Sequence, residues 1–287
     1  MIIVTGASGQ LGSAIARKVV EKMPAHRVGV SVRDVGKAAD LAALGVRVRK
    51  GDFAEPATLA HAFEGASQVL LVSSNGSATG QDTRAQHRAA IDAARAAGAE
   101  RILYTSHMAV SATSAFGPMH DHAATEVMLA SCGTAWTSLR NGFYASSAMM
   151  LMEDAFRTGR LEAPIDGKVS WTTHADLAEA AALILANGGF DGPTPPLTAP
   201  DALDLADLAR FASELLGRPI ERVVTSDDAL RQKMLARGLP PRVADVALGR
   251  YLASRAGEFS AVDPTLAGLL GRAPTGMKDL LAARLRA

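Results

Sequence analysis

The chain has 287 residues, 48% of them hydrophobic and 21% charged, which is ordinary for a soluble globular protein. Thirty basic residues against 29 acidic ones leave a net charge of +1, which argues against a nucleic-acid-binding protein. A single cysteine, Cys132, excludes an intramolecular disulfide and a thiolate metal cluster. Without a basic leader or a long apolar stretch, we expect a cytoplasmic protein with no membrane span and no bound metal.

The first half of the chain alternates short β-rich runs with helical patterns. Apolar runs such as Ile2–Thr5 are typical of strands buried on both faces, and Leu11, Ile15 and Val19 follow the spacing of a helix face. The expected strands are 2–5, 28–32, 46–49, 68–72, 101–105 and 135–139, and the expected helices are 11–19, 37–44, 56–63, 84–97 and 122–131. This alternation predicts an α/β fold with a Rossmann-type, doubly wound parallel sheet.

The second half is less regular. It shows helical patterns over 175–186 and 205–216, a proline-rich crossing segment over 192–200, a short strand over 220–224 and mostly helix beyond Thr225. We expect residues 1–150 to form a nucleotide-binding core and 151–287 a smaller, interleaved C-terminal lobe, with about 165–187 returning to the core.

A glycine-rich loop lies between the first expected strand and helix, where a dinucleotide-binding loop belongs. Gly6 permits the tight turn, Gly9 leaves room for a pyrophosphate, and Gly12 allows close packing of helix on strand. The cofactor's diphosphate would then meet free N–H groups at the helix N-terminus. The loop residues expected to bind it are Gly6, Ala7, Ser8, Gly9, Gln10, Leu11 and Gly12. A glycine turn without a ligand is the alternative.

Arg33 follows the second expected strand at the position where NAD-binding proteins often carry an acid for the ribose 2′-hydroxyl. Its guanidinium can hold a 2′-phosphate instead. A charge-assisted hydrogen bond of about 1.5–3 kcal/mol predicts a 10- to 100-fold preference for NADP(H) over NAD(H). The adjacent Asp34 opposes this preference, and a solvated Arg–Asp pair is the alternative.

Polar residues after the third and fourth expected strands complete the predicted cofactor site. Asp52 is placed to accept a hydrogen bond from the adenine amino group, and Phe53 to pack on the ring; a plain strand-end turn is the alternative. Ser73 and Ser74 suit a cofactor that crosses toward the nicotinamide side. The long polar loop over 73–83 is expected to be a mobile flap.

The acid/base pair of classical short-chain dehydrogenases, a tyrosine with a lysine four residues later, is absent. The residues four positions after Tyr104, Tyr144 and Tyr251 are Met108, Ala148 and Arg255. A hydride acceptor that needs little proton donation from the protein is therefore favoured. Quinones and cationic dyes are such acceptors, and the protein then contributes proximity and orientation.

The chain resembles the NmrA-like atypical short-chain dehydrogenases, in particular the bacterial NAD(P)H:quinone oxidoreductases and triphenylmethane reductases. The matching motifs are Val4 to Gly12, Val32-Arg33-Asp34, Gly51-Asp52-Phe53, Tyr104-Thr105-Ser106, His122 with Thr125-Glu126, Leu139 to Tyr144, and Leu269 to Arg272. In one departure from the family, Val127 stands where some relatives carry lysine.

The resemblance also implies roles for single residues. It implies that Tyr104, Thr105 and Ser106 contribute to the cofactor site and that Asn141 and Gly142 lie beside the nicotinamide. Phe143 and Tyr144 would face the substrate cleft. Asn141 and Tyr144 are thus candidate catalytic residues that position the substrate.

Three further features have two readings each. His122 has a substrate or proton role, or it caps or packs a helix. The methionines Met149, Met150 and Met152 form an adaptable wall for a flat substrate, or they pack in the core. Trp171 and Thr173 reach the substrate cleft, or they do not.

The function expected first is an NADPH-dependent reductase of a quinone or similar planar aromatic small molecule. The alternatives are a non-catalytic NADP-sensing regulator of the NmrA type and a triphenylmethane or azo dye reductase. A monomer and a homodimer are both compatible with the sequence.

Overall fold

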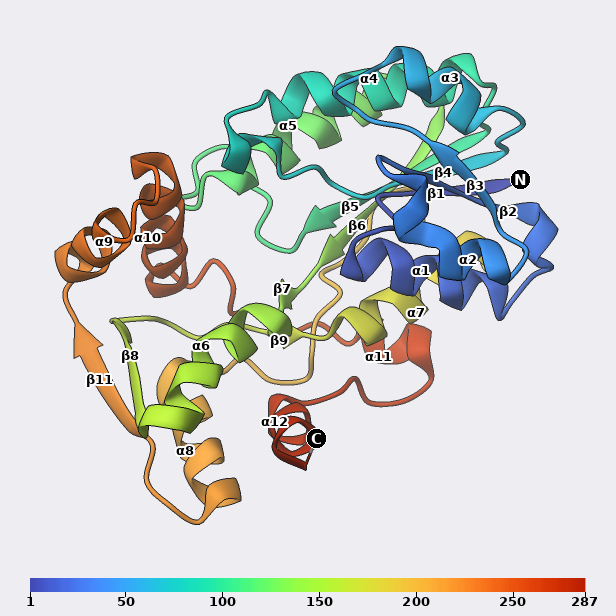
Figure 1. Ribbon diagram of the computed structural model, residues 1–287. Helices are drawn as coiled ribbons and strands as arrows, with labels where there is room; N and C mark the ends of the chain where they lie inside the picture. Colours follow the sequence, from blue (N-terminus) through green and yellow to red (C-terminus); the bar gives the residue numbers. More distant parts are fainter. Residues whose placement is uncertain (287) are drawn as a thin grey trace. The chain divides into compact units, whose positions relative to one another are not determined.

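A parallel sheet of seven strands forms the centre of one of the two units into which the chain folds (Figure 1). The structure, a computed structural model, describes residues 1–286. The strands are β1 (Ile2–Thr5), β2 (Val28–Val32), β3 (Arg47–Lys50), β4 (Gln68–Leu71), β5 (Arg101–His107), β6 (Ala135–Asn141) and β10 (Gly192–Pro193). Their order is β10-β6-β5-β4-β1-β2-β3, and all neighbouring pairs are parallel. The order reverses between β1 and β4, at the switch point where doubly wound folds bind ligands, so the expected fold class is confirmed.

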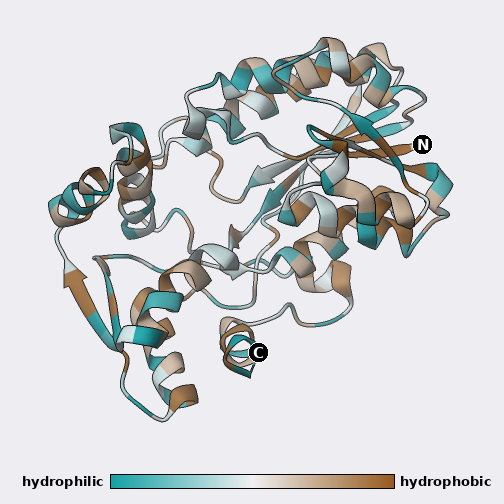
Figure 2. Ribbon diagram, in the orientation of Figure 1, coloured by the Kyte–Doolittle hydropathy of each residue, from teal (hydrophilic) through white to brown (hydrophobic). Residues whose placement is uncertain are grey.

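Helices cover both faces of this sheet within the first unit (Figure 1). They are α1 (Gln10–Val20), α2 (Ala39–Ala43), α3 (Ala57–Phe63), α4 (Thr83–Ala96), α5 (Pro118–Ala130) and α7 (His174–Asn187), with short 3-10 helices η1 (Ala25–Arg27), η2 (Val35–Ala38) and η3 (Gly76–Thr79). On one face α1 packs against α7. On the other, a core that includes Phe63, Ile91 and Tyr104 joins α3, α4 and α5 to the strands. Figure 2 shows that edge strand β3, unlike the central strands, is mainly hydrophilic.

The second unit consists of residues 108–120, 142–173 and the chain from Pro196 onward. Its elements are β7 (Phe143–Tyr144), α6 (Ala145–Thr158), β8 (Arg160–Pro164), β9 (Trp171–Thr172), α8 (Leu205–Leu216), β11 (Glu221–Thr225), α9 (Asp227–Ala236), α10 (Pro241–Arg255), α11 (Thr265–Leu270) and α12 (Met277–Arg286). β8 pairs with β11, and β7 pairs with β9. The Phe143 ring lies 4.9 Å from that of Phe259 and 5.4 Å from that of Trp171, at the centre of this unit's core.

Along the chain, the boundary between the two units is not at residue 150, where it was expected. The first unit consists of Met1–His107, Asp121–Asn141 and His174–Pro195, so the returning segment is 174–195 rather than 165–187. The chain leaves the first unit where β6 ends, because the next apolar side chain, Phe143, is buried among the aromatic rings of the second. In residues 1–286, no helix is long and apolar enough to cross a membrane.

Single elements also differ from expectation. Strand β10 lies in the proline-rich segment that was expected only to cross over, and it adds a seventh strand beside β6. Helix α6 and strand β8 were not expected, since the methionine-rich run that forms α6 shows little polar alternation. The single helix expected over 37–44 is η2 followed by the five-residue α2.

Candidate cofactor site

A hollow of about 410 Å³ opens in the first unit at the carboxyl ends of β1, β2 and β4. Its lining is polar and rich in glycine: Thr5, Gly6, Ser8, Gly9, Ser31, Val32, Arg33, Lys37, Gly51, Asp52, Phe53, Ala54, Val72, Ser73, Ser74, Asn75, Gly76, Thr79, Gln81 and Gln86. These residues come from segments that are far apart in the sequence. The parallel topology brings them to one edge of the sheet, where ligands of such folds bind.

The glycine loop has the backbone geometry that a close ligand approach requires. Gly6 has a φ of +62°, and its N–H donates to the carbonyl of Ser31 at 2.9 Å. A Cβ at Gly12 would lie 2.5 Å from the Gly6 carbonyl oxygen, so only glycine lets α1 start this close to β1. Gly9 caps α1 without a side-chain hydrogen bond and lines the hollow, which leaves the helix N-terminus open to an anion.

Two basic residues line the hollow after β2. Arg33 and Lys37 are both exposed. The neighbouring carboxylate of Asp34 accepts the Gly36 N–H at 3.0 Å and caps η2. Asp34 therefore caps the local turn and does not line the hollow, whereas the two cationic side chains of Arg33 and Lys37 do.

Ser31 and Gly51 lie beside each other where β2 meets the end of β3. The Ser31 hydroxyl is buried and has no hydrogen-bond partner among residues 1–286, although Ser31 lines the hollow. A Cβ at Gly51 would lie 2.1 Å from this hydroxyl oxygen and 3.0 Å from the Cβ of Ala62, so a larger residue would displace the Ser31 side chain. An orphaned hydroxyl at the wall of the hollow is what a site for a hydroxyl-bearing ligand such as a ribose would contain.

Asp52 and Phe53 line the hollow beyond β3. One carboxylate oxygen of Asp52 accepts the Ala54 N–H at 2.9 Å, and the Asp52 N–H donates to the Thr58 hydroxyl at 2.9 Å. Asp52 thus closes the strand-end turn, which was the alternative reading, and at the same time forms part of the wall.

The loop after β4 is anchored to the strand beside it and to α4. The Ser73 N–H donates to the Thr105 hydroxyl at 2.8 Å, and the Ser74 N–H donates to Nε2 of His87 at 2.8 Å. The Ser74 hydroxyl donates to the side-chain oxygen of Gln86. Ser73 and Ser74 are held so that both line the hollow.

The rest of this loop, expected to be a mobile flap, also has fixed partners. The Ser77 N–H donates to the Thr83 hydroxyl at 2.7 Å. The carboxylate of Asp121 accepts from the Ser77 hydroxyl at 2.8 Å and from Arg84 at 2.8 Å. The loop is therefore tied to the beginnings of α4 and α5.

Two histidines, His87 and His122, contact the ring of Tyr104, and a third, His107, neighbours His122. Tyr104 is buried, and its hydroxyl lies 2.8 Å from Nδ1 of His122. The Tyr104 ring lies 5.2 Å from that of His87, and the His107 ring 6.2 Å from that of His122. Burial lowers the pKa of His87 and His122 to about 4 and that of His107 to about 3, so all three rings are neutral near pH 7.

Glu126 forms a second polar cluster between α5 and the strands. Its carboxylate accepts from the hydroxyls of Ser106 and Ser138, each at 2.8 Å, and from Arg140 at 2.7 Å. Burial favours the neutral acid, but these hydrogen bonds outweigh it and lower the pKa of Glu126. The hydroxyl of Ser106 is therefore engaged in a structural network.

Eight of the residues predicted to bind cofactor line the hollow: Gly6, Ser8, Gly9, Arg33, Asp52, Phe53, Ser73 and Ser74. The other loop residues, Ala7, Gln10, Leu11 and Gly12, support the turn and the start of α1. Tyr104, Thr105 and Ser106 lie in β5 behind the wall, where Tyr104 belongs to the core. Other polar side chains line the hollow without having been predicted to do so: Ser31, Lys37, Thr79, Gln81 and Gln86. Lys37 could have been predicted, because it is a second basic residue only four positions after Arg33.

The motif at the end of β6 is divided between the two units. Asn141 ends β6 in the first unit, and its buried side-chain oxygen has no hydrogen-bond partner in the described chain. Gly142 donates its N–H to the Leu197 carbonyl at 2.8 Å, and a Cβ there would lie 2.1 Å from the Thr172 hydroxyl oxygen. Tyr144 is half-buried in β7. The expectation that Phe143 faces substrate is wrong, because its ring is in the core of the second unit.

Of the residues with two readings, the three methionines, Trp171 and Thr173 lie in the second unit, whereas His122 lies in the first. Met152 and Trp171 are core residues, and Met149 packs against that core, whereas Met150 is 78% exposed. Thr173 is buried. Val127, where some relatives carry lysine, is 69% exposed on α5, so a lysine there would extend into solvent.

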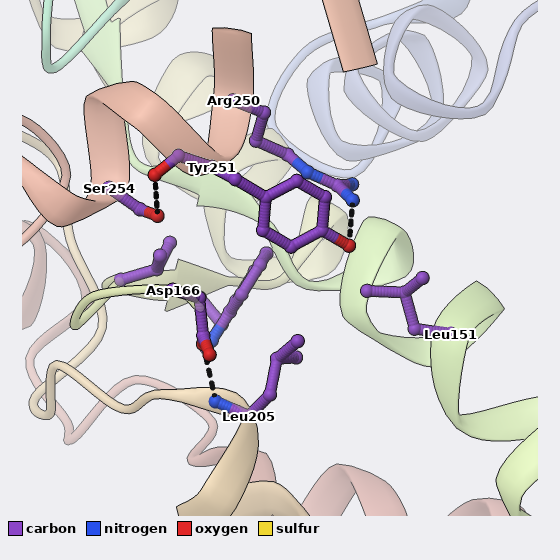
Figure 3. A pocket seen from close by; sticks show the side chains of 8 residues that line it. Leu151, Asp166, Leu205, Arg250, Tyr251 and Ser254 are labelled. Carbon is purple, nitrogen blue, oxygen red and sulfur yellow. Dashed lines mark hydrogen bonds between the residues drawn. The ribbon is translucent and has the colours of Figure 1, made fainter. Parts of the chain in front are cut away.

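A hollow of about 10 Å³ in the second unit is the size of one water molecule (Figure 3). Its polar groups are already paired: Asp166 accepts the Leu205 N–H at 2.7 Å, and the Tyr251 hydroxyl accepts from Arg250 at 2.9 Å. This hollow is a packing defect rather than a substrate site. Within residues 1–286, no group of three or more His, Cys, Asp or Glu residues is placed to hold a metal ion.

Comparison with known proteins gives a consistent family. A family model described as NAD(P)H-binding matches residues 6–187. Quinone oxidoreductase 2 of Escherichia coli K12 is 34% identical over 97% of this chain and 96% of its own length. An NAD(P)H azoreductase of Xenophilus azovorans is 30% identical over 95% of this chain and 93% of its own length.

Solved structures extend this result. The crystal structure of the NADPH-dependent Escherichia coli quinone oxidoreductase QOR2 in complex with NADPH has a TM-score of 0.92 and 32% identity, and covers 99% of this chain and all of its own. The transcriptional regulator NmrA shares the fold at only 18% identity, with a TM-score of 0.75. The chain therefore belongs to the NAD(P)H-binding family, among its NmrA-like reductases, and is an NAD(P)H-dependent oxidoreductase.

Proposed function

We propose that this protein uses NADPH in preference to NADH and reduces quinones or similar planar aromatic molecules. The observation that carries the cofactor preference is the pair Arg33 and Lys37 in the hollow beside a carboxylate, Asp34, that is already used as a cap. Two cations at this point favour a 2′-phosphate over a 2′-hydroxyl. The quinone class is supported by the 34% identity to quinone oxidoreductase 2.

In this proposal each part of the hollow holds one part of the cofactor. The loop around Gly9 and the start of α1 bind the diphosphate, Arg33 and Lys37 bind the 2′-phosphate, and Ser31 bonds a ribose hydroxyl. Asp52 and Phe53 border the adenine, and the anchored serines of the β4 loop guide the cofactor toward β5. When bound, NADPH supplies a hydride.

Asn141 and Tyr144 are proposed to position the acceptor. The buried, unpartnered oxygen of Asn141 suits an amide N–H of the nicotinamide. Tyr144 is a half-buried residue, and a tyrosine hydroxyl suits a polar edge of the acceptor. Azo or triphenylmethane dyes are a second acceptor class, which the 30% identity to the azoreductase supports.

The test is oxidation of NADPH, followed by its absorbance, with a panel of quinones and dyes. We expect quinone-dependent oxidation and a far lower KM for NADPH than for NADH. Tight binding of NADPH without acceptor-dependent oxidation would overturn the proposal and would restore the NADP-sensing regulator.

A further inference from the structure

Tyr104, which is buried, and His122, which is half-buried, form a pair that does not line the cofactor hollow. The Tyr104 hydroxyl lies 2.8 Å from Nδ1 of His122, and the two ring centroids are 5.6 Å apart. Tyr104 is on β5, and His122 is near the N-terminus of α5, the helix that follows this strand. The pair therefore lies toward the carboxyl edge of the sheet, where the reacting groups of such folds gather.

The chemistry of this contact determines which nitrogen of His122 carries the proton. An imidazole nitrogen is a better acceptor than a phenol oxygen, so the Tyr104 hydroxyl donates and Nδ1 accepts. A neutral ring that accepts at Nδ1 carries its proton on Nε2. The burial that lowers the pKa of His122 to about 4 keeps the ring in this neutral form, although Asp121 and Glu126 favour the charged form.

Nε2 is the atom of this pair that remains for a ligand. Within the described residues, the His122 side chain makes its hydrogen bond to Tyr104 through Nδ1, and the residue is half-buried. The neighbouring His107 pairs in register with Asn141, whose side-chain oxygen is also unpartnered. The inferred Nε2–H of His122 and the unpartnered amide oxygen of Asn141 thus belong to two residues that both neighbour His107, the last residue of β5.

We propose that Nε2–H of His122 donates a hydrogen bond to the acceptor oxygen on which negative charge develops, and that Tyr104 is the positioning residue that maintains this tautomer. The inference rests on the proposed quinone reductase function. The quinone gains two electrons and a proton as hydride from NADPH, its oxyanion is stabilised by His122, and water supplies the second proton. His122 itself exchanges no proton, so the step balances without a tyrosine–lysine pair.

The activity test compares His122→Phe and His122→Gln, with His61→Phe as a matched control at an exposed histidine on α3. We expect His122→Phe to lower kcat with a quinone by about 100-fold, as loss of one oxyanion donor does elsewhere. The KM for quinone and the Kd for NADPH should be unchanged, because the bond strengthens only as charge develops. His122→Gln should restore part of kcat. An unchanged kcat in folded His122→Phe would overturn the proposal.

A second measurement does not depend on turnover. ¹⁵N NMR of the histidine rings should show the Nε2–H tautomer for His122, and Tyr104→Phe should convert it into a mixture while lowering kcat without changing the Kd for NADPH. A ring that carries its proton on Nδ1 in the unmodified protein would overturn the proposal. Failure of the proposed function is a separate result, namely unmodified protein without quinone-dependent NADPH oxidation.

Discussion

The backbone N–H of Ser74 donates to Nε2 of His87 at 2.8 Å. Because a backbone N–H can only donate, Nε2 of His87 must be unprotonated, and the ring proton lies on Nδ1. Nδ1 lies 2.7 Å from the Thr125 hydroxyl oxygen, which in turn donates to the Asp121 carbonyl at 2.7 Å. A single neutral imidazole thus connects the wall of the cofactor hollow to α5.

Removing this imidazole should loosen the wall. We expect His87→Leu to lower the free energy of unfolding by about 1–3 kcal/mol, because the Ser74 N–H and the Thr125 hydroxyl lose their buried partner. The KM for NADPH should rise as well, since Ser74 lines the hollow. Urea unfolding and steady-state kinetics measure both effects. His87→Gln, whose amide can both accept and donate, should recover part of each, whereas equal stability of the Leu variant and the unmodified protein would contradict this account.

Acid should destabilise the protein over a defined pH range. The pKa values of His87, His107 and His122 are lowered from 6.5 to about 4, 3 and 4, so the unfolded chain binds more protons than the folded one below pH 6.5. Stability is therefore fully present above about pH 6.5 and falls as the pH falls toward 4. Each histidine contributes a slope of about 1.4 kcal/mol per pH unit in this range.

Measurement of the free energy of unfolding at a series of pH values should show this decline. His87→Gln should reduce the slope of the free energy against pH by the contribution of one histidine. A flat profile between pH 6.5 and 4.5 would show that these rings are accessible to protonation.

The part of the site that could be predicted from the sequence is the part formed by contiguous segments. The loop from Gly6 to Gly12 and the residue pair Arg33-Asp34 follow strands whose apolar pattern is clear, so their place at the sheet edge follows from topology. The role of Asp34 as a cap was not predictable, because it depends on a 3-10 turn that starts at Val35.

Features that depend on contacts between distant segments could not be predicted. The unpartnered hydroxyl of Ser31 is visible only once Gly51 is seen packed against it. Phe143 stands in a motif expected to face substrate, yet it fills the core of the second unit with Phe259, 116 positions later in the chain. No periodicity in either segment indicates that partner.

Gly9 and Gly12 should respond differently to valine, although both belong to the same loop. A Cβ at Gly9 would lie 3.3 Å from the Gly6 carbonyl oxygen, a tight contact that a small shift relieves. The methyl groups of a valine there would, however, occupy the position proposed for the diphosphate. At Gly12 the Cβ would lie 2.5 Å from the same oxygen. We expect Gly9→Val to fold and to lose NADPH binding, and Gly12→Val to fold poorly. Calorimetric titration with NADPH and thermal unfolding separate the two, and a folded Gly9→Val variant with unchanged affinity would refute the loop assignment.

Arg33 and Lys37 should determine which cofactor is used. Each can make a charge-assisted hydrogen bond to the 2′-phosphate of NADPH, worth about 1.5–3 kcal/mol, so Arg33→Ala should raise the KM for NADPH by 10- to 100-fold. The effect of Lys37→Ala should be smaller, because a flexible ammonium group lacks the bidentate geometry of a guanidinium. The KM for NADH should change little in either variant, since NADH has no 2′-phosphate.

Lys22→Ala, which removes an exposed lysine after α1 that is not part of the hollow, controls for a general loss of positive charge. Equal increases for NADPH and NADH in Arg33→Ala would remove Arg33 from the phosphate site and would leave Lys37 as its main cation.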